Sequence, residues 1–369
     1  MPTINLVKTS PIKNTFRVAK IQGMFDIPRA DESTFTLRAN MPIDEKEWTI
    51  GLITGASGSG KTTIARHLWP NTTIQGEHQW NSHSLVDDFP REMTPQDITL
   101  ILNSVGFSST PAWLRPYHVL STGQQFRADL ARALAETPNG LVVFDEFTST
   151  VDRTVAAAAS HAVAKTIRRQ TGRQFVAVTC HKDVEEWLQP DWVFDTDTNE
   201  FTWGCKRRPQ ITMVIREGLR QAWPIFRNHH YLTGDLSPAA RVFLAYVKLG
   251  NQPERLAGFF SILPSMGHKG WRRGHRTVVL PDFQGLGIGN RMIETVAELL
   301  WQREHLRFRA VTSSPALVKH RLRHPDMWRL AQGPSMKAKT GRTSKHQKMR
   351  TSAGRLTTGW VFIPQNLRR

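Results

Sequence analysis

Residues 55–62 read Gly55-Ala56-Ser57-Gly58-Ser59-Gly60-Lys61-Thr62, which fits the pattern G-x-x-x-x-G-K-[ST]. The apolar run Trp48–Thr54 precedes this stretch and the helical run Thr63–Leu68 follows it, so a strand, a loop and a helix are predicted in that order. The glycines let backbone N–H groups turn inward around a phosphate, and the helix N-terminus adds its dipole. The stretch therefore predicts a site for a nucleoside triphosphate and Mg²⁺.

Within this loop, Lys61 is expected to reach the β- and γ-phosphates and Thr62 to supply a hydroxyl to Mg²⁺. The residues expected to bind the nucleotide are Gly55, Ser57, Gly58, Ser59, Gly60, Lys61, Thr62 and Thr63. Such a loop occurs in kinases, GTPases, RecA-like proteins and ABC ATPases. The loop alone therefore leaves the class of protein open.

Two later segments resemble motifs of the ABC ATPases. Leu120-Ser121-Thr122-Gly123-Gln124 precedes a helical run and resembles their LSGGQ signature, with Thr122 in place of the first glycine. The apolar run Leu141–Phe144 ends in Asp145-Glu146 and resembles their Walker B strand. The resemblance implies that Asp145 belongs to the Mg²⁺ shell and that Glu146 activates the attacking water. It also implies that Ser121, Gly123 and Gln124 bind nucleotide.

Two further segments keep the order expected of that family. Ser149-Thr150-Val151-Asp152 resembles the D-loop, and Val178-Thr179-Cys180-His181 resembles the switch strand, whose histidine, here His181, contacts the γ-phosphate. The segment that resembles the family's Q-loop, Leu85–Phe89, carries acidic residues where glutamine is usual. The resemblance covers about residues 15–205 and implies an ATPase head that forms a head-to-tail homodimer around two ATP molecules.

A second glycine-rich turn follows the β-branched run that begins at Thr277. The stretch Gln284-x-x-Gly287-x-Gly289 leads into the helical run Asn290–Arg303, without the Lys-Thr pair needed for phosphoryl transfer. It resembles the [QR]-x-x-G-x-[GA] motif of GNAT acyltransferases, which grips the pyrophosphate of acetyl-CoA. The resemblance implies cofactor binding at Gln284, Gly285, Gly287 and Gly289. A dinucleotide site or a plain strand–turn–helix matches the bare pattern as well.

The GNAT resemblance also implies a chemistry, in which an amine attacks the thioester while a base removes its proton. Many GNAT enzymes protonate the thiolate with a tyrosine well after the glycine turn, but this chain has no tyrosine after Tyr246. The best polar cluster of the basic half, His229-His230-Tyr231, supplies His230 and Tyr231 as candidate catalytic residues, with an ordinary capping loop as the alternative. The segments at residues 229–232 and 312–316 give a thin likeness to Mom-type phage acyltransferases, which modify DNA bases.

The charge of the chain is uneven. Residues 1–210 carry 22 Lys and Arg against 23 Asp and Glu, whereas residues 211–369 carry 27 against 8. A basic excess of this kind attracts polyanions, so nucleic acid is the expected partner, with a solvated surface as the alternative. The segment 203–209 holds a Gly, a basic triplet and a Pro where the balance changes.

The expected fold class is α/β, with two domains. Residues 1–208 are predicted to form a P-loop ABC ATPase domain, and residues 209–369 a smaller mixed α/β GNAT-like domain with a basic C-terminal segment. The sequence shows no internal repeat, and Lys337–Arg350 is expected to be a flexible basic loop. The 369 residues suit two or three domains at roughly 100–200 residues each.

Composition narrows the class of protein further. Hydrophobic residues make up 39% of the chain, as in globular proteins, and the two cysteines exclude a disulfide framework and favour the cytoplasm. No apolar run is long enough to cross a bilayer.

The leading hypothesis is an enzyme that couples ATP hydrolysis to N-acyl transfer onto an amine of a nucleic acid. The alternative is an ATP-switched nucleic-acid clamp with a non-catalytic GNAT-like domain. The acceptor, the acyl donor and the coupling are left open.

Overall fold

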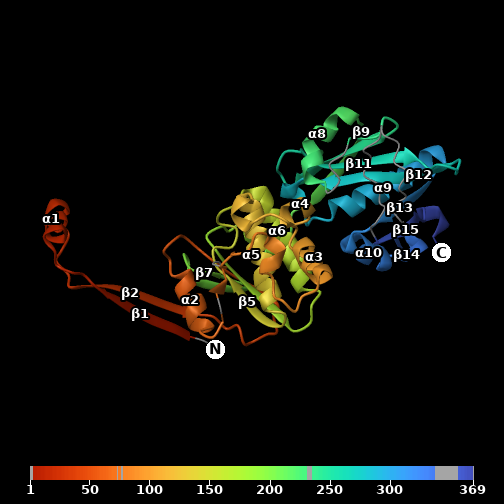
Figure 1. Cartoon of the computed structure of the whole chain (residues 1–369). Helices are drawn as coiled ribbons and strands as arrows, with labels where there is room; N and C mark the ends of the chain where they lie inside the picture. The colour runs from red at the N-terminus through yellow and green to blue at the C-terminus, as the bar shows by residue number, and fades with distance from the viewer. Residues whose placement is uncertain (1–2, 73, 76–77, 231–234, 337–355, 369) are drawn as a thin grey trace.

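The computed structural model describes residues 3–72, 74–75, 78–230, 235–336 and 356–368. Two separate β-sheets, one of six strands and one of seven, dominate the structure, and helices pack against each of them (Figure 1). The six-stranded sheet ends at Trp203 and the seven-stranded sheet begins at Ile211, so we call these two regions the N-terminal part and the C-terminal part. The mixed α/β class and the order of its two regions are therefore as predicted.

The six-stranded sheet has the order β4-β5-β6-β3-β7-β8. Its strands are β3 (Ile50–Thr54), β4 (Ile74–Gln75), β5 (Gly140–Phe144), β6 (Arg173–Thr179), β7 (Trp192–Asp195) and β8 (Glu200–Trp203). All neighbours are parallel except β7 and β8. Every residue of β3 is buried, as expected for a strand at the centre of a parallel sheet that is covered on both faces.

Helices cover the two faces of this sheet unequally. One face packs on α3 (Pro95–Ser104), α5 (Thr122–Glu136) and α6 (Arg153–Ile167), and the other on α2 (Lys61–Leu68). Alternation along β3 sets the faces, because Leu52 belongs to the first core and Ile53 to the second. The short helices α4 (Thr110–Trp113) and α7 (Val184–Leu188) and the 3₁₀ turns Leu85–Asp88 and Tyr117–Val119 complete the N-terminal part.

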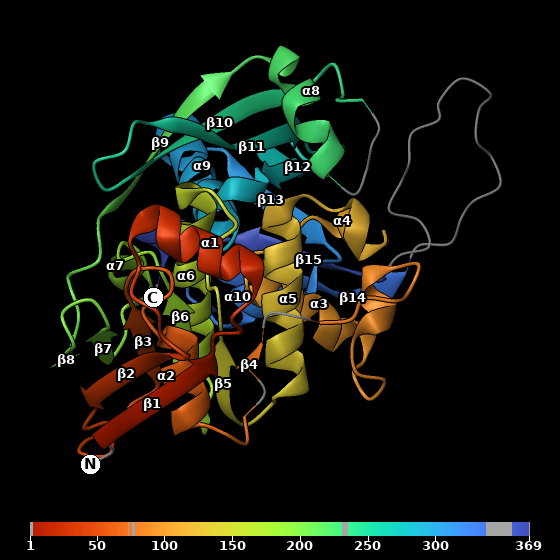
Figure 2. The same cartoon turned by 90° about the vertical axis from the view of Figure 1, so that its left-hand side faces the viewer.

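A hairpin arm extends from the N-terminal part. Strands β1 (Thr3–Pro11) and β2 (Glu32–Asn40) pair antiparallel, and helix α1 (Phe16–Phe25) lies at the tip, far from the C-terminal part (Figure 1). Figure 2 shows the molecule from the side of the arm, with α1 toward the viewer. The base of the arm is fixed because Ile4 and Ala39 join the core beneath α2. In contrast, α1 buries none of its residues.

The seven-stranded sheet has the order β14-β15-β13-β12-β11-β10-β9. Its strands are β9 (Ile211–Gly218), β10 (Arg241–Leu249), β11 (Arg255–Pro264), β12 (Trp271–Val279), β13 (Arg307–Thr312), β14 (Trp328–Met336) and β15 (Leu356–Phe362). The parallel neighbours β12 and β13 pair only from Trp271 to Arg273 and then separate, whereas the other neighbours are antiparallel.

Helix α9 (Ile288–Glu304) packs one face of this sheet through Met292, Val296 and Leu300. On the other face, α8 (Trp223–Phe226) places Trp223 and Phe226 against Phe259 of β11. Helix α10 (Pro315–Leu322) and the 3₁₀ turns Arg220–Ala222, Arg227–His229, Pro281–Phe283 and Gln365–Leu367 complete the C-terminal part. No helix among the described residues combines the length and the apolar character that a bilayer crossing requires.

Most elements expected from the sequence are present, with shifted ends. The run Val155–Gln170 forms α6, which begins at Arg153 because the Asp152 side chain accepts the N–H groups of Thr154 and Val155. It ends at Ile167, and residues 168–170 form turns. The predicted flexible loop Lys337–Arg350 lies outside the described residues.

The two parts of the chain meet where α6 packs against the loop before α9. Ala157 belongs to the core of the C-terminal part, and a Cβ added to Gly285 would lie 2.9 Å from Cβ of Ala162. From the N-terminal part, the Ser108 N–H donates to Oε1 of Gln284 at 2.7 Å. Small side chains on α6 therefore permit a close backbone approach between the two parts.

We expect Ala162→Leu to open this contact, because the larger side chain must displace the backbone at Gly285. Overpacking of a close contact costs about 1–3 kcal/mol. Thermal unfolding should shift down and separate into two transitions. Ala19→Leu is the control, since it makes the same change in α1, which buries nothing. Equal, unaltered melting of both variants would contradict the packing described.

Candidate functional site

The predicted phosphate-binding loop connects the buried strand β3 to α2, which begins at Lys61 directly after Gly60 (φ +94°). The Lys61 ammonium donates to the carbonyl oxygens of Gly55 at 2.9 Å and Ala56 at 2.6 Å, so it closes the loop on itself. A Cβ added to Gly58 would meet nothing within 4 Å. Space is therefore open beside Gly58, while Lys61 is held on the first two residues of the loop.

Thr62 and Asp145 meet across the sheet. Strand β6 separates β3 from β5, and the Thr62 hydroxyl donates to Oδ2 of Asp145 at 2.7 Å. One hydroxyl and one carboxylate at this spacing form a pair of oxygen ligands suited to Mg²⁺. The described residues contain no cluster of three or more His, Cys, Asp or Glu that could hold a metal. Nucleotide phosphates or water would have to supply the remaining ligands.

Glu146 follows Asp145 in a left-handed backbone conformation, at φ +50°. Its N–H donates to Oδ1 of Asp145 at 2.9 Å, so both carboxylate oxygens of Asp145 are engaged. Glu146 itself is exposed. The left-handed backbone at Glu146 is strained, and it lets the carboxylates of Asp145 and Glu146 point in different directions.

A turn that sequence patterns did not reveal supports the loop. After β7, the Asp197 carboxylate accepts the Ala56 N–H at 2.7 Å, and the hydroxyls of Thr196 and Ser59 lie 2.6 Å apart. The hydrogen bond from Ala56, followed by that from Lys182, lowers the pKa of Asp197. Only the parallel pairing of β3 with β7 brings this turn to the loop, so no local signal could have identified it.

An aromatic ring also borders the loop from the hairpin arm. A Cβ added to Gly60 would lie 3.0 Å from Cζ of Phe35 and 2.8 Å from Cδ1 of Leu37. Phe35 is 40% exposed, so its ring can accept a flat partner such as a nucleobase. No sequence pattern identified Phe35, because the hairpin is distant from the loop along the chain.

The signature-like residues lie at the N-terminus of α5. Ser121 and Gln124 form a capping box, in which Gln124 Oε1 accepts the Ser121 N–H at 3.1 Å. Gly123 lies beside Val155 of α6. His181 follows β6, and its N–H donates to the Thr179 hydroxyl at 3.2 Å. In the segment that resembles the Q-loop, Leu85–Phe89, the Asp88 carboxylate accepts hydrogen bonds from the N–H and the hydroxyl of Ser82. Asp88 therefore stabilises the local loop.

Next to this helix, Arg127 is a buried cation that the sequence analysis missed. It is 1% exposed, and burial lowers its pKa to about 10, while Asp282 and Asp152 oppose that shift. Asp282 also accepts from Arg255 at 3.3 Å, and Arg255 donates to the Thr154 hydroxyl at 2.7 Å. These charges link α5 and α6 to the 3₁₀ turn that precedes the second glycine loop.

The second glycine loop has one covered side and one open side. Gln284 is buried and donates through Nε2 to the Val279 carbonyl at 2.9 Å, while Gly285 packs on α6. Gly287, at φ +78°, is exposed, and a Cβ there would meet nothing within 4 Å; Gly289 follows in the first turn of α9. The N-terminus of this 17-residue helix is therefore open at Gly287, beside the strands β12 and β13 that separate after Arg273.

Of the two candidate catalytic residues His230 and Tyr231, the structure describes only the first. His230 is 5% exposed, and its ring lies 5.9 Å from that of Trp223, within the aromatic cluster against β11. Tyr231 lies outside the described residues. The structure therefore places His230 in a packed position.

Residues 182–319 match the model of the acetyltransferase (GNAT) family. The chain carries a GNAT acetyltransferase domain. The family match begins at Lys182, ahead of β7 and β8, whereas the sheet of the GNAT domain begins at Ile211. No curated protein matches the chain.

Solved structures resemble the two parts separately. A dimeric bacterial ABC transporter cassette is 16% identical, covers 52% of this chain and 92% of its own, and gives a TM-score of 0.37. An IAA acetyltransferase from Bacillus cereus is 16% identical, covers 41% of this chain and all of its own, and gives 0.29. A spermidine/spermine N-acetyltransferase from Vibrio cholerae is 10% identical, covers 41% and 92%, and gives 0.30.

We expect Phe35→Ala to weaken ATP binding by about one to two powers of ten, because stacking of a base on an aromatic ring is worth roughly 1–3 kcal/mol. Phe35→Trp should retain binding. Phe16→Ala, in the exposed helix α1, is the matched control for loss of an arm phenylalanine. Titration calorimetry with ATP measures all three, and an unchanged dissociation constant for Phe35→Ala would exclude base stacking there.

Proposed function

We propose that this protein binds and hydrolyses ATP in its N-terminal part and transfers an acyl group from acyl-CoA to an amine in its GNAT domain, with an amine of a nucleic acid as the acceptor. The observation that carries the proposal is the presence of two glycine-rich loops in one chain, each before the N-terminus of a helix and each with open space at a glycine. Space is free beside Gly58 in one loop and beside Gly287 in the other.

For ATP, the loop residues 55–63 supply backbone donors, and Lys61 neutralises phosphate charge once it leaves the loop carbonyls. Thr62 and Asp145, already 2.7 Å apart, would hold Mg²⁺. Glu146 would orient the attacking water, and His181, after the strand between the two motifs, would contact the terminal phosphate. Ser121, Gly123 and Gln124 would contact the nucleotide of a second copy.

For acyl transfer, the backbone of residues 284–289 and the dipole of α9 would hold the pyrophosphate of acetyl-CoA or another acyl-CoA. The thioester supplies an activated acyl group. Beyond Arg273, β12 stays paired with β11 but is no longer paired with β13, so an extended ligand would lie between β12 and β13. His230 and Tyr231 stay candidates for the proton transfers.

We also propose residues 1–208 and 209–369 as the two domains. The break between the sheets, from Gly204 to Gln210, supports this division. In the cell we place the protein in the cytoplasm, where both ATP and acyl-CoA are present.

Gly287→Glu tests the acyl-CoA site. A carboxylate at this position should repel the pyrophosphate and abolish acetyl-CoA binding in titration calorimetry. Gly267→Glu is the matched control, because Gly267 also has φ near +75° and open space around it, so the backbone strain is equal. If Gly287→Glu binds acetyl-CoA as tightly as Gly267→Glu does, the acyl-transfer proposal fails.

Glu146→Gln tests the ATP-dependent dimer. Removal of this carboxylate should stop hydrolysis without loss of ATP binding, so a dimer should accumulate on size exclusion with ATP and Mg²⁺. Lys61→Ala is the control, since it should lose ATP binding and elute as a monomer. A Glu146→Gln protein that is monomeric at saturating ATP would contradict the head-to-tail dimer.

A second candidate function is an ATP-switched nucleic-acid clamp whose GNAT domain does not catalyse. Two observations favour it: the chain has no tyrosine after Tyr246, and the Gln284–Gly285 side of the glycine loop is covered by the N-terminal part. Acetyl-CoA binding without any acyl transfer, together with ATP-dependent DNA retention, would select this function.

A further inference from the structure

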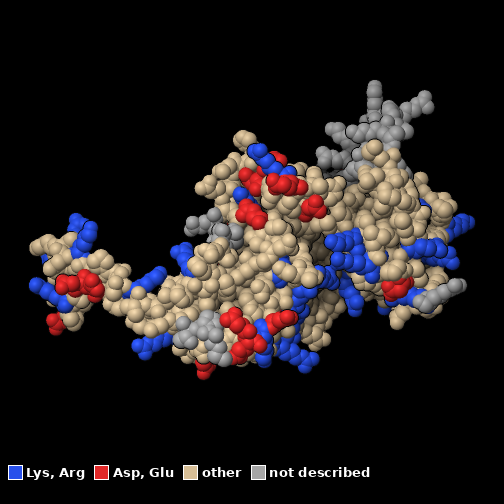
Figure 3. Space-filling model, turned by 90° about the horizontal axis from the view of Figure 1, so that it is seen from below, with Lys and Arg blue, Asp and Glu red and all other residues tan. Residues whose placement is uncertain are grey.

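A cluster of cations lies where the N-terminal part meets the GNAT domain. Figure 3 shows Lys and Arg side chains gathered in a band across this face. We call the residues that interact there the junction patch: His161, Lys165, Arg168, Arg169, Arg208 and Arg323. The first four come from α6 and its C-terminal turn, Arg208 from the link between the sheets, and Arg323 from the end of α10.

These like charges are close enough to perturb one another. Desolvation, and then the charges of Arg169 and Arg323, lower the pKa of Lys165. Desolvation and Arg168 lower the pKa of Arg208. Cations of the N-terminal part and of the GNAT domain therefore repel one another in the folded protein.

His161 lies within the same field. Desolvation, followed by the charges of Arg208 and Lys165, lowers its pKa to about 4, so its imidazole is neutral at neutral pH. Its Nδ1 is buried without a hydrogen-bond partner. The positive potential of the patch thus comes from its Lys and Arg members.

Few carboxylates compensate the patch. Arg168 pairs with Asp191 at 2.8 Å, while within the described ranges no ion pair joins Lys165, Arg169, Arg208 or Arg323 to an acidic side chain. Helix dipoles favour cations at the C-termini of α6 and α10. That effect is confined to the last turn of each helix and is screened by salt, so it does not explain five cations from three segments.

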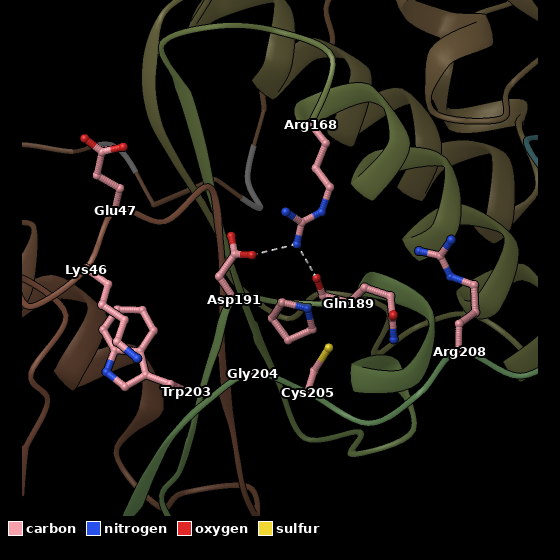
Figure 4. A pocket seen from close by; sticks show the side chains of 10 residues that line it. Lys46, Glu47, Arg168, Gln189, Asp191, Trp203, Gly204, Cys205 and Arg208 are labelled. Atoms are coloured by element: carbon pink, nitrogen blue, oxygen red, sulfur yellow. Dashed lines mark hydrogen bonds and ion pairs between the residues drawn. The ribbon is translucent and has the colours of Figure 1, made fainter.

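A pocket continues the patch on the N-terminal part. It has a volume of about 670 Å³, and Arg168, Arg208 and Lys46 contribute cationic side chains to its lining (Figure 4). Asp191 precedes β7, so the pocket lies at the N-terminal edge of the parallel sheet, opposite the edge that carries the phosphate-binding loop. The patch and pocket are therefore distinct from the nucleotide site.

We propose that the junction patch binds the sugar-phosphate backbone of a nucleic acid and that this strand contacts both parts of the chain at once. The inference rests on the nucleic-acid acceptor of the proposed function and assigns its binding surface. Guanidinium groups suit it because each can donate two parallel hydrogen bonds to a phosphate. Four of the five cations are arginines.

The chemistry of the patch favours nucleic acid over a membrane surface. Helices that lie in a membrane interface present an apolar face beside their cations. Among the described residues of α6, of the 204–210 link and of α10 with its cap, Leu322 is the one exposed large apolar side chain. A phosphate backbone needs charge and donors alone.

The test is the salt dependence of binding to a fluorescent DNA duplex, measured by anisotropy without ATP or acyl-CoA. The variant Lys165→Ala/Arg169→Ala/Arg323→Ala removes three exposed cations of the patch. Its slope of log affinity against log salt should fall by about 2–3, since each phosphate contact contributes about 0.9. Affinity at low salt should drop at least tenfold.

The matched control, Lys13→Ala/Lys20→Ala/Arg29→Ala, removes the same charge from exposed positions of the hairpin arm. It should bind DNA with the parental slope. Both variants should keep the parental melting temperature and acetyl-CoA affinity, which shows that they are folded.

Three results would overturn the inference. If both triple variants lose affinity equally, net charge and not the patch is responsible. If the patch variant binds DNA normally but loses binding to anionic phospholipid vesicles, the surface serves a membrane. If the parent protein binds neither DNA nor RNA duplexes in a salt-dependent way, the proposal of a nucleic-acid acceptor is wrong. A protein that binds DNA but not acetyl-CoA would instead contradict only the proposed acyl transfer.

Discussion

The close packing of α6 against the loop that precedes α9 is the contact on which the arrangement of this protein depends. Ala157, Ala158 and Ala162 give α6 a surface without long side chains, and Gly285 brings a backbone directly onto it. Gly106 makes the reciprocal approach, since a Cβ there would lie 2.6 Å from the Gln284 carbonyl oxygen. Such contacts tolerate little change of volume, so they fix the relative position of the two parts.

Buried charge reinforces the same junction. Arg127 of α5 has Nε and Nη2 buried without hydrogen-bond partners, and the carboxylates of Asp152 and Asp282 balance its charge from opposite sides of the contact. A buried cation of this kind is stable only while its counter-charges stay near. Any movement of α5 away from the GNAT domain would therefore separate Arg127 from Asp282 and cost electrostatic energy. Asp152 also caps α6, so the segment after Glu146 leads directly into the junction.

The two glycine-rich loops share a backbone design, since each ends in a glycine at positive φ before a helix, but they differ in what surrounds them. In the first, Phe35 and Leu37 approach Gly60, and the turn at Thr196 supports Gly55, while Gly58 stays open. In the second, the N-terminal part covers Gly285, and Gly287 stays open. Each loop is thus enclosed by an element from elsewhere in the chain, which limits access without filling the site.

The sequence by itself determined the motifs, their order and the α/β class, because glycine spacing and apolar periodicity are local properties of the chain. The strand before Gly55, the Asp145-Glu146 pair at a strand end and the helix after Gly289 could all be predicted this way. The N-cap of α6 at Asp152 is also local, because its side chain bonds only to the next few residues. The tertiary structure alone decided the roles of Phe35, Asp197 and Arg127, since sheet order and packing bring them to their partners from distant positions. It also decided that one side of the second glycine loop is covered and that cations from α6 and α10 meet, because burial and charge density depend on which surfaces face each other.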